Sequence, residues 1–495
     1  MEINYLRTKQ RGSLSAIVLF SITVMSASIF ISSLSEDFNP IIALIFIFSG
    51  IYITYTASRH QLIHSFRSWI NALNLYTIIS ILVFLFFWYL PLSELGKLTT
   101  ATQLPEYQDA NYYDHLAHLA HDKPLKEWLN ISGATWLSQG VVIYLTSIYR
   151  LFGASQFNYL FVNILLNFTS LIFLEGIANS NKFSNYSQIS EKKSHVFISL
   201  FLPFIVYYSI TPGKEVLNNF TLYLLMFLVF QFLNNKKVNI ISVLASIILL
   251  GIVRLHSLVI IFAIISGYIL AFKIKMLKSV RFVLATVFVL FLFFLIINFI
   301  SSRFVGVSIF EFINLLSFDS TIDGVYEVVD RYETGLKSQI AIFVTSKNPI
   351  LHFLLSPFRI LIWLLSPLPF VVDPVFSFFS SIFSGDSYSR FRSLEIFRLI
   401  DSLTLVFISF RLIPKVIVRR RLYYGEATRF LFWVGLALSV FLTLRIVEAA
   451  RYRVLVEPII LTWAMLFLHE CSVDRRLMMT RVNIWRGQAG NVAQS

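Results

Sequence analysis

The sequence VNIISVLASIILLGIVRLHSLVIIFAIISGYILAF, residues 238–272, determines the class of this protein. It is apolar along almost all of its length, and each half approaches the length of a membrane-spanning helix. Comparable stretches recur along the chain of 495 residues, which is 57% hydrophobic and only 14% charged, with a mean hydropathy of +0.72. Since soluble domains carry about 25% charged residues, the composition excludes a cytosolic enzyme, a secreted disulfide domain and a disordered protein. We expect an all-α polytopic membrane protein.

Apolar segments of helical length predict about twelve (about 11–13) membrane-spanning helices. They lie near residues 13–34, 39–57, 73–92, 157–179, 196–211, 215–233, 238–253, 255–272, 282–300, 396–413, 428–446 and 453–470. The first is too long for a signal peptide and a second follows at once, so we expect a retained anchor. The single cysteine, Cys471, excludes an intramolecular disulfide and a cysteine-based metal site.

Lysine and arginine residues gather at alternate ends of these segments and predict their orientation. The richest stretch includes Arg411, Lys415 and Arg429, and other clusters lie near the N-terminus, at 273–281 and at 475–486. Placing all of these clusters in the cytoplasm also places both termini there. The net charge of +14 is therefore interpreted as a topology signal and not as a nucleic-acid footprint.

This orientation divides the chain into five parts. Residues 1–92, 157–300 and 396–495 carry the N-terminal, central and C-terminal membrane helices, the last with a basic cytoplasmic tail. Residues 93–156 form a first outer loop with amphipathic helices, and residues 301–395 form a second outer region. Inside that region prolines interrupt the apolar segment 349–372, which predicts a re-entrant hairpin or an interfacial helix. A thirteenth span is the alternative.

The first outer loop contains the pattern of an amphipathic helix from Asp109 to His121. Asp109 and Tyr113 share one stripe, while histidines recur on a neighbouring stripe. A carboxylate here is a candidate general base, and we assign this role to Asp109 and then to Asp114. Asp114, His118 and His121 have the spacing of a metal-binding face, but exposed histidines on such a helix are more often ordinary polar surface.

Charged residues occupy several short outer turns between apolar segments. The turns contain Lys214 and Glu215, Arg254 and His256, and Arg451 and Arg453. Charge at membrane depth is costly and usually faces a cavity or a partner, so we interpret these residues as a site at one outer face. The alternative is that they are ordinary turn charges solvated at the interface.

Several motifs in this order resemble the GT-C superfamily of polytopic glycosyltransferases, in particular those of bacterial polysaccharide pathways. The first is Asp109-Ala-Asn-Tyr-Tyr-Asp114-His-Leu-Ala117 in the outer loop. The others are Ile148-Tyr-Arg-Leu-Phe-Gly153, Leu202-Pro-Phe-Ile-Val-Tyr-Tyr-Ser209 followed by Lys214-Glu215, Arg254, Ser366-Pro-Leu-Pro-Phe370, and Arg451-Tyr-Arg453 with Glu457-Pro458. The resemblance covers about residues 100–470.

The resemblance implies sugar transfer from a polyprenyl-phosphate-linked donor to a glycan or lipid-linked acceptor at the periplasmic face of the bacterial inner membrane. Asp109 or Asp114 would accept the proton of the attacking hydroxyl. Cations would stabilise the departing phosphate, because its charge develops in the transition state. The candidates for substrate and phosphate binding are Tyr113, Lys214, Glu215, Arg254, His256, Arg451, Tyr452 and Arg453. The spacing indicates no metal ligands, although a divalent metal is compatible with this chemistry.

Three other functions fit the same composition. A polymerase of O-antigen or exopolysaccharide repeat units would use the same lipid carriers and would transfer a whole oligosaccharide. A transporter of polysaccharides or lipid-linked sugars would suit twelve spans, but such proteins often show internal repeats, which the sequence lacks. The third alternative is a non-enzymatic member of a polysaccharide assembly complex.

Overall fold

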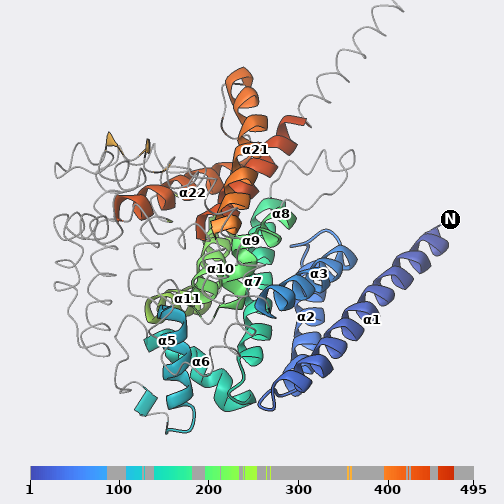
Figure 1. Ribbon diagram of the computed structural model, residues 1–495. Coiled ribbons are helices and arrows are strands. Elements are labelled where there is room, and N and C mark those ends of the chain that lie inside the picture. The colour runs from blue at the N-terminus through green and yellow to red at the C-terminus, as the bar shows by residue number, and fades with distance from the viewer. Residues whose placement is uncertain are drawn as a thin grey trace, which may run out of the picture.

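The computed structural model shows an all-helical chain. It describes residues 2–85, 108–124, 127–128, 139–180, 196–211, 213, 215–233, 238, 240–253, 264, 268, 354–355, 357–358, 360, 395–419, 422, 425–445 and 455–472. Helices and turns account for the ordered structure of these residues, and no β-strand occurs among them (Figure 1).

Six helices of the described chain are long and apolar enough to cross a membrane. They are Ser13–Leu34 within α1 (Glu2–Leu34), α2 (Ile41–Arg59), α3 (Phe66–Phe84), α7 (Gln156–Asn179), Glu215–Phe232 within α10 (Glu215–Leu233), and the C-terminal helix Leu455–Ser472. These helices coincide with predicted spans and fit a helical membrane protein. Three further predicted spans fall on helices α11 (Ile240–Val253), α21 (Glu395–Arg419) and α22 (Glu426–Arg445). Segments 255–272, 282–300 and 349–372 lie wholly or mostly outside the described residues, so the count of twelve stays a prediction.

Apolar side chains cover the outward faces of α1 and α2. Leu14, Ile22 and Ile29 on α1 and Phe48 and Tyr52 on α2 are all more than half exposed. A soluble protein rarely exposes so continuous an apolar surface, whereas lipid chains would cover it at no cost. The exposed apolar faces of α1 and α2 therefore agree with the membrane location that their composition predicts.

The third apolar helix begins earlier than its hydropathy predicts. We expected a span near 73–92, but α3 begins at Phe66. Ser65 is extended, and its side chain accepts a hydrogen bond from the backbone N–H of Ser68 at 3.3 Å. This N-cap starts the helix ahead of the apolar run.

The predicted continuous span 196–211 is wrong. The chain instead forms two short helices, α8 (Phe197–Leu200) and α9 (Pro203–Ile210). Pro203 has no N–H to donate, and Leu202 before it is extended with φ −60° and ψ 123°. Neither helix alone is long enough to cross a hydrocarbon core of about 30 Å, since α9 is only about 12 Å long, so a crossing at 196–211 would need both helices in series.

Helix α7 joins the two ends of the bundle and is about 36 Å long. At its start, the Ser155 and Ser35 hydroxyls lie 3.1 Å apart, and the Asn158 side chain accepts a hydrogen bond from the backbone N–H of Asn39. At its end, the Asn179 side chain donates to the Leu62 carbonyl at 2.7 Å. The α1–α2 turn and the α2–α3 turn therefore lie at opposite ends of α7.

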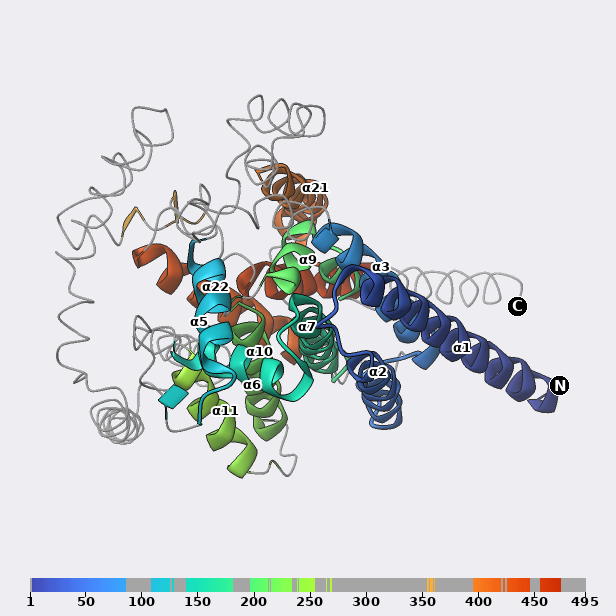
Figure 2. The ribbon, with the colours of Figure 1, turned by 60° about the horizontal axis from the view of Figure 1, so that its bottom comes forward.

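Helices α5 (Gln108–Ala120) and α6 (Gln139–Phe152) lie beside each other near the start of α7. Figures 1 and 2 show both of them at the end where the α1–α2 turn lies. We call this the α5–α6 end. The helix predicted from Asp109 to His121 is confirmed as α5.

Gly153 fixes the sharp turn between α6 and α7. Its φ is +98°, and a Cβ atom here would lie 2.8 Å from the backbone oxygen of Asp37. Gly153→Ala should therefore destabilise the fold by about 1–2 kcal/mol, because L-residues are disfavoured in the left-handed region and the neighbouring backbone would have to move. Thermal unfolding in detergent measures the effect.

The control is Gly435→Ala. A Cβ atom there would meet Ile459 at an ordinary contact distance of 3.4 Å, and the helical backbone is favourable for alanine. Equal stability of the two variants would contradict the role assigned to Gly153.

Candidate functional site

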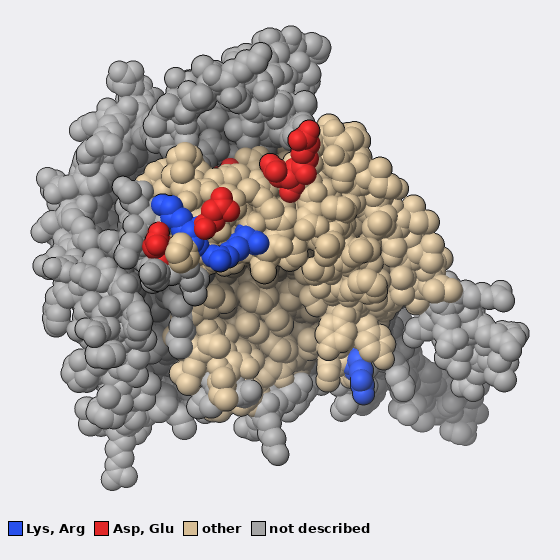
Figure 3. All heavy atoms as spheres, turned by 90° about the horizontal axis from the view of Figure 1, so that it is seen from below, with Lys and Arg blue, Asp and Glu red and all other residues tan. Residues whose placement is uncertain are grey.

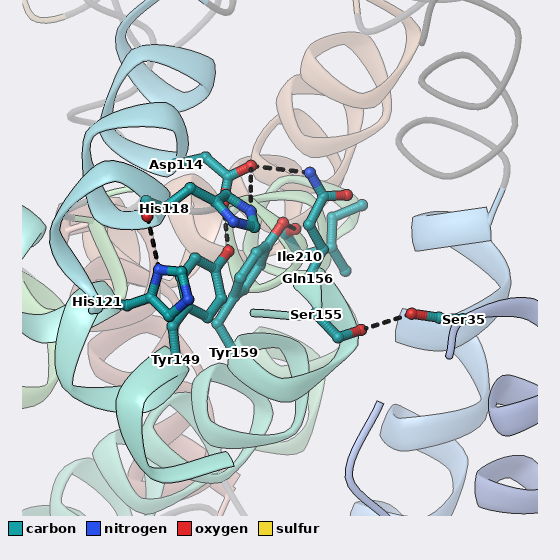
Figure 4. Close-up of polar contacts among 9 residues, drawn as sticks. All are labelled: Ser35, Asp114, His118, His121, Tyr149, Ser155, Gln156, Tyr159 and Ile210. Carbon is teal, nitrogen blue, oxygen red and sulfur yellow. Dashed lines mark hydrogen bonds and ion pairs between the residues drawn. The ribbon is translucent and has the colours of Figure 1, made fainter. Parts of the chain in front are cut away.

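Asp114 is the central residue of the α5–α6 end. It is buried on α5, and its carboxylate accepts hydrogen bonds from side chains of two other helices. The phenol of Tyr149, on α6, donates to Oδ1, and the amide of Gln156, the first residue of α7, donates to Oδ2 at 2.9 Å. Figure 4 shows this convergence. A buried carboxylate needs such donors, and here they also fix its position.

His118 lies between the Asp114 carboxylate and the surface. Its Nε2 is 3.9 Å from Asp114 Oδ2, and its side chain is 38% exposed. The ring also packs on Tyr149, with the centroids 4.7 Å apart. Asp114, Tyr149, Gln156 and His118 form a group that we call the Asp114 cluster.

The metal-binding face of Asp114, His118 and His121, the less favoured alternative from the sequence, is not formed. His121 Nδ1 lies 2.6 Å from the backbone oxygen of His118, and its Nε2 lies 3.3 Å from the carboxylate of Asp122 (Figure 4). Its ring nitrogens therefore contact other groups. Among the residues that the structure describes, no three His, Cys, Asp or Glu side chains are placed to hold a metal ion.

The backbone oxygen of Lys123 connects the segment after α5 to α6. It accepts hydrogen bonds from the Arg150 guanidinium at 2.8 Å and from the Trp128 indole at 3.0 Å. The guanidinium also lies over the Trp128 ring, 5.6 Å from its centroid. Figure 3, which views this end, shows a small mixed group of charged side chains on a mainly uncharged described surface.

Helix α9 ends at a turn that contacts α7 further along its length than the Asp114 cluster does. The Tyr159 phenol donates to the Ile210 carbonyl at 3.4 Å, and the Asn163 amide donates to the Thr211 carbonyl at 3.1 Å. Asn163 itself accepts from the Tyr144 phenol of α6 at 2.6 Å. Asn163 lies about 10 Å along α7 from Gln156. We call Ile210, Thr211, Gly213 and Glu215 the recessed turn, because Ile210 and Thr211 contact α7 well inside its length.

The polar side chains of α7 have a clear structural role at this turn. The last carbonyls of a helix lack partners within it, and an apolar environment offers no water to replace them. Tyr159 and Asn163 supply the missing donors. Irregular backbone at such depth usually lines a site or is buried in protein. The described contacts show that this turn is buried in protein.

A second polar network lies deeper. The Asn167 amide donates to the Ser209 hydroxyl, which also contacts the Tyr76 hydroxyl, and Asn167 accepts from Asn219 at 3.4 Å. All four side chains are buried. They connect α3, α7, α9 and α10 through polar contacts in an otherwise apolar core.

Glu215, one of the predicted binding residues, begins α10 and is buried at the recessed turn. Its carboxylate lies next to Gly213, at the positive end of the α10 dipole. The neighbouring Lys214 lies outside the described residues. The structure therefore places Glu215 in the recessed turn, and the binding role of Lys214 stays a prediction.

The C-terminal helix contacts α10 near its own start. The Tyr223 phenol donates to the Leu455 carbonyl at 3.0 Å, and Glu457 is fully buried in the same turn of the helix. The Glu457-Pro458 motif thus lies beside α10, two turns beyond Glu215.

The structure describes only some of the remaining predicted site residues. Tyr113 is buried in the core. Asp109 lies in the first turn of α5, and the described structure does not extend to its side chain. The positions outside the described residues are Arg254, His256, Arg451, Tyr452 and Arg453. Of the predicted site, the structure thus places Asp114, Tyr113 and Glu215.

Sequence reasoning missed the residues that hold Asp114 and the recessed turn. Gln156, Asn163 and Asn167 recur at helical spacing in a segment that is otherwise apolar. Amides at such spacing in a membrane helix indicate a face that meets polar groups. Tyr149 carried no comparable signal, because aromatic residues are common throughout this chain.

The Tyr149 phenol has a pKa raised well above its ordinary value of 10.0, first by burial and then by the charge of Asp114. Its neutral form is therefore favoured in the folded state. The contribution of this phenol to the free energy of unfolding is fully present below pH 10. It is lost as the pH rises above 10, where the phenol of the unfolded chain ionises. Thermal unfolding of the protein and of Tyr149→Phe should show stabilities that converge above pH 10. Parallel curves would contradict this role.

Comparisons with protein-family models, with curated proteins and with solved structures found no match. The function is therefore proposed from the residues and the geometry alone.

Proposed function

We propose that this chain is a GT-C-type glycosyltransferase of the bacterial inner membrane. It would cross the membrane about twelve times, with both termini in the cytoplasm and the α5–α6 end at the periplasmic face. The substrates would be a polyprenyl-phosphate-linked sugar and a glycan or lipid-linked acceptor. Two observations support the placement: the apolar helices have spanning length, and the basic clusters of the sequence alternate between their ends.

The observation that carries the proposal is the Asp114 carboxylate. It is buried, it is held by donors from two other helices, and it lies in the loop whose sequence resembles the GT-C superfamily. An acceptor hydroxyl is a poor nucleophile, so a positioned carboxylate must accept its proton as it attacks the anomeric carbon. The bond from that carbon to the phosphate oxygen breaks, and polyprenyl phosphate leaves. A single displacement inverts the anomeric configuration.

The departing phosphate gains negative charge, so cations near it lower the barrier. Lys214 is the candidate whose sequence neighbours, Gly213 and Glu215, belong to the recessed turn. Arg254, Arg451 and Arg453 are the other candidates, since arginine can contact a phosphate through two nitrogens. The burial of the recessed turn would strengthen such interactions.

The experiment that tests the proposal is a structural analysis of the cell-surface or lipid-linked glycan, with and without the protein. Loss of one sugar residue on deletion, restored by the wild-type chain and by a folded Asp109→Asn variant but not by a folded Asp114→Asn variant, is expected. Comparing these two variants identifies which carboxylate acts as the base. An unchanged glycan would contradict the proposal.

A further inference from the structure

Helix α21 exposes a continuous apolar face. Leu403, Phe407, Phe410, Ile413 and Ile417 recur at helical spacing, and each is about half exposed or more. Among the described side chains of α21, buried residues on its other sides lie only between Leu399 and Leu412, and the helix packs against α9. In Figures 1 and 2, α21 stands apart from α5 and α6. This face therefore belongs to a different region from the Asp114 cluster.

Cations line one edge of that apolar face. Arg411, Lys415 and Arg419 follow one another at intervals of four residues in the last turns of α21. Arg411 and Lys415 are exposed. The guanidinium of Arg411 lies 4.9 Å from the centroid of the Phe407 ring, so it extends along the boundary between the apolar face and the cations.

The charges of Arg411 and Lys415 are not neutralised within the described chain. Neither forms an ion pair with a described residue, and the two acidic residues of α21, Glu395 and Asp401, lie near its other end, about 20 Å or more from Lys415 along the helix. A partner for this surface must offer hydrocarbon to the phenylalanines and negative charge to the cations at the same boundary.

We propose that the last turns of α21 bind anionic phospholipid, with Arg411 and Lys415 on the headgroup phosphate and the Phe407–Ile417 face on the acyl chains. An anionic lipid carries both chemical features at the required junction. Simple snorkelling of the two side chains to water would explain their position, but it would give no preference for anionic over zwitterionic lipid. This inference is independent of the proposed glycosyl transfer.

Native mass spectrometry of the full chain in detergent tests it, with phosphatidylglycerol and phosphatidylcholine as probes. The wild-type chain should retain more phosphatidylglycerol. Arg411→Gln/Lys415→Gln should weaken that binding on the order of tenfold and leave phosphatidylcholine binding unchanged, given the attraction of each cation for an anionic surface.

The matched control is Arg59→Gln/Arg67→Gln, which removes two exposed cations from α2 and α3 and changes the net charge equally. This control should bind phosphatidylglycerol as the wild type does. Equal binding of the two lipids by the wild type, or equal weakening in both double variants, would overturn the proposal. The proposal would also be overturned if the wild-type chain binds a second copy of itself, rather than lipid, and this dimer dissociates when Arg411 and Lys415 are replaced.

Discussion

Asp114→Asn is expected to reduce sugar transfer at least about 100-fold while the protein still folds. The substitution is nearly isosteric, and the new amide oxygen can still accept from the Tyr149 phenol. The Gln156 amide can rotate to present its oxygen to the new N–H₂ group. What is lost is the ability to accept a proton, and general-base catalysis typically contributes about 10²–10⁴-fold. Product formation by purified protein, together with its unfolding temperature, measures both effects.

Two further variants separate chemistry from structure. Asp114→Ala removes the acceptor of both hydrogen bonds, and it should lose activity and also about 1–3 kcal/mol of stability, because Tyr149 and Gln156 lose their buried partner. Asp122→Asn changes a carboxylate on the same segment whose side chain is 87% exposed, and it should behave as the wild type. If Asp114→Asn keeps full activity, Asp114 is a structural residue and Asp109 becomes the remaining candidate base.

Asn167→Leu is expected to destabilise the bundle by about 2–3 kcal/mol. The side chain contacts Ser209, Tyr76 and Asn219, and it is buried where α7 meets three other helices. Leucine would leave the Asn219 amide without this acceptor and would place a branched side chain among polar groups. The unfolding temperature in detergent should fall, and the loss should be measurable without any substrate.

The control for this prediction is Thr169→Val on the same helix. The Thr169 hydroxyl donates only to the Leu165 carbonyl of α7 itself, and its side chain is partly exposed. Valine should therefore change the stability by no more than about 0.5 kcal/mol. A smaller effect for Asn167→Leu than for this control would show that the polar network contributes nothing to the packing of α9.

The individual helices could be predicted because their signal is local. Each pattern can be recognised within one segment of the sequence: the apolar runs of α1, α2, α7 and α10, and the amphipathic pattern of α5. The failure at 196–211 was also local: Pro203 breaks the helix, but it lies inside an apolar run that has nearly the length of a span. Hydropathy averages over such a break, whereas the backbone does not.

The surroundings of Asp114 could not be predicted, because its partners lie far along the chain. Tyr149 is 35 residues away and Gln156 is 42 residues away. Many aromatic and amide residues lie within similar distances in the sequence, and only the angle at which α5 meets α6 and α7 selects these two. In the same way, the position of the recessed turn depends on which turn of α7 supplies amides to the end of α9. The packing of the two helices determines this position, and the sequence of one segment does not.

The most direct test uses purified protein, a polyprenyl-phosphate-linked sugar and a lipid-linked acceptor, with the mass of each product recorded. We expect that the acceptor gains one sugar residue, that an equal amount of polyprenyl phosphate is released, and that Asp114→Asn yields neither product. A gain of a whole oligosaccharide would identify a polymerase instead. No gain in mass with any lipid-linked donor, from purified protein that is folded, would contradict the proposed sugar transfer.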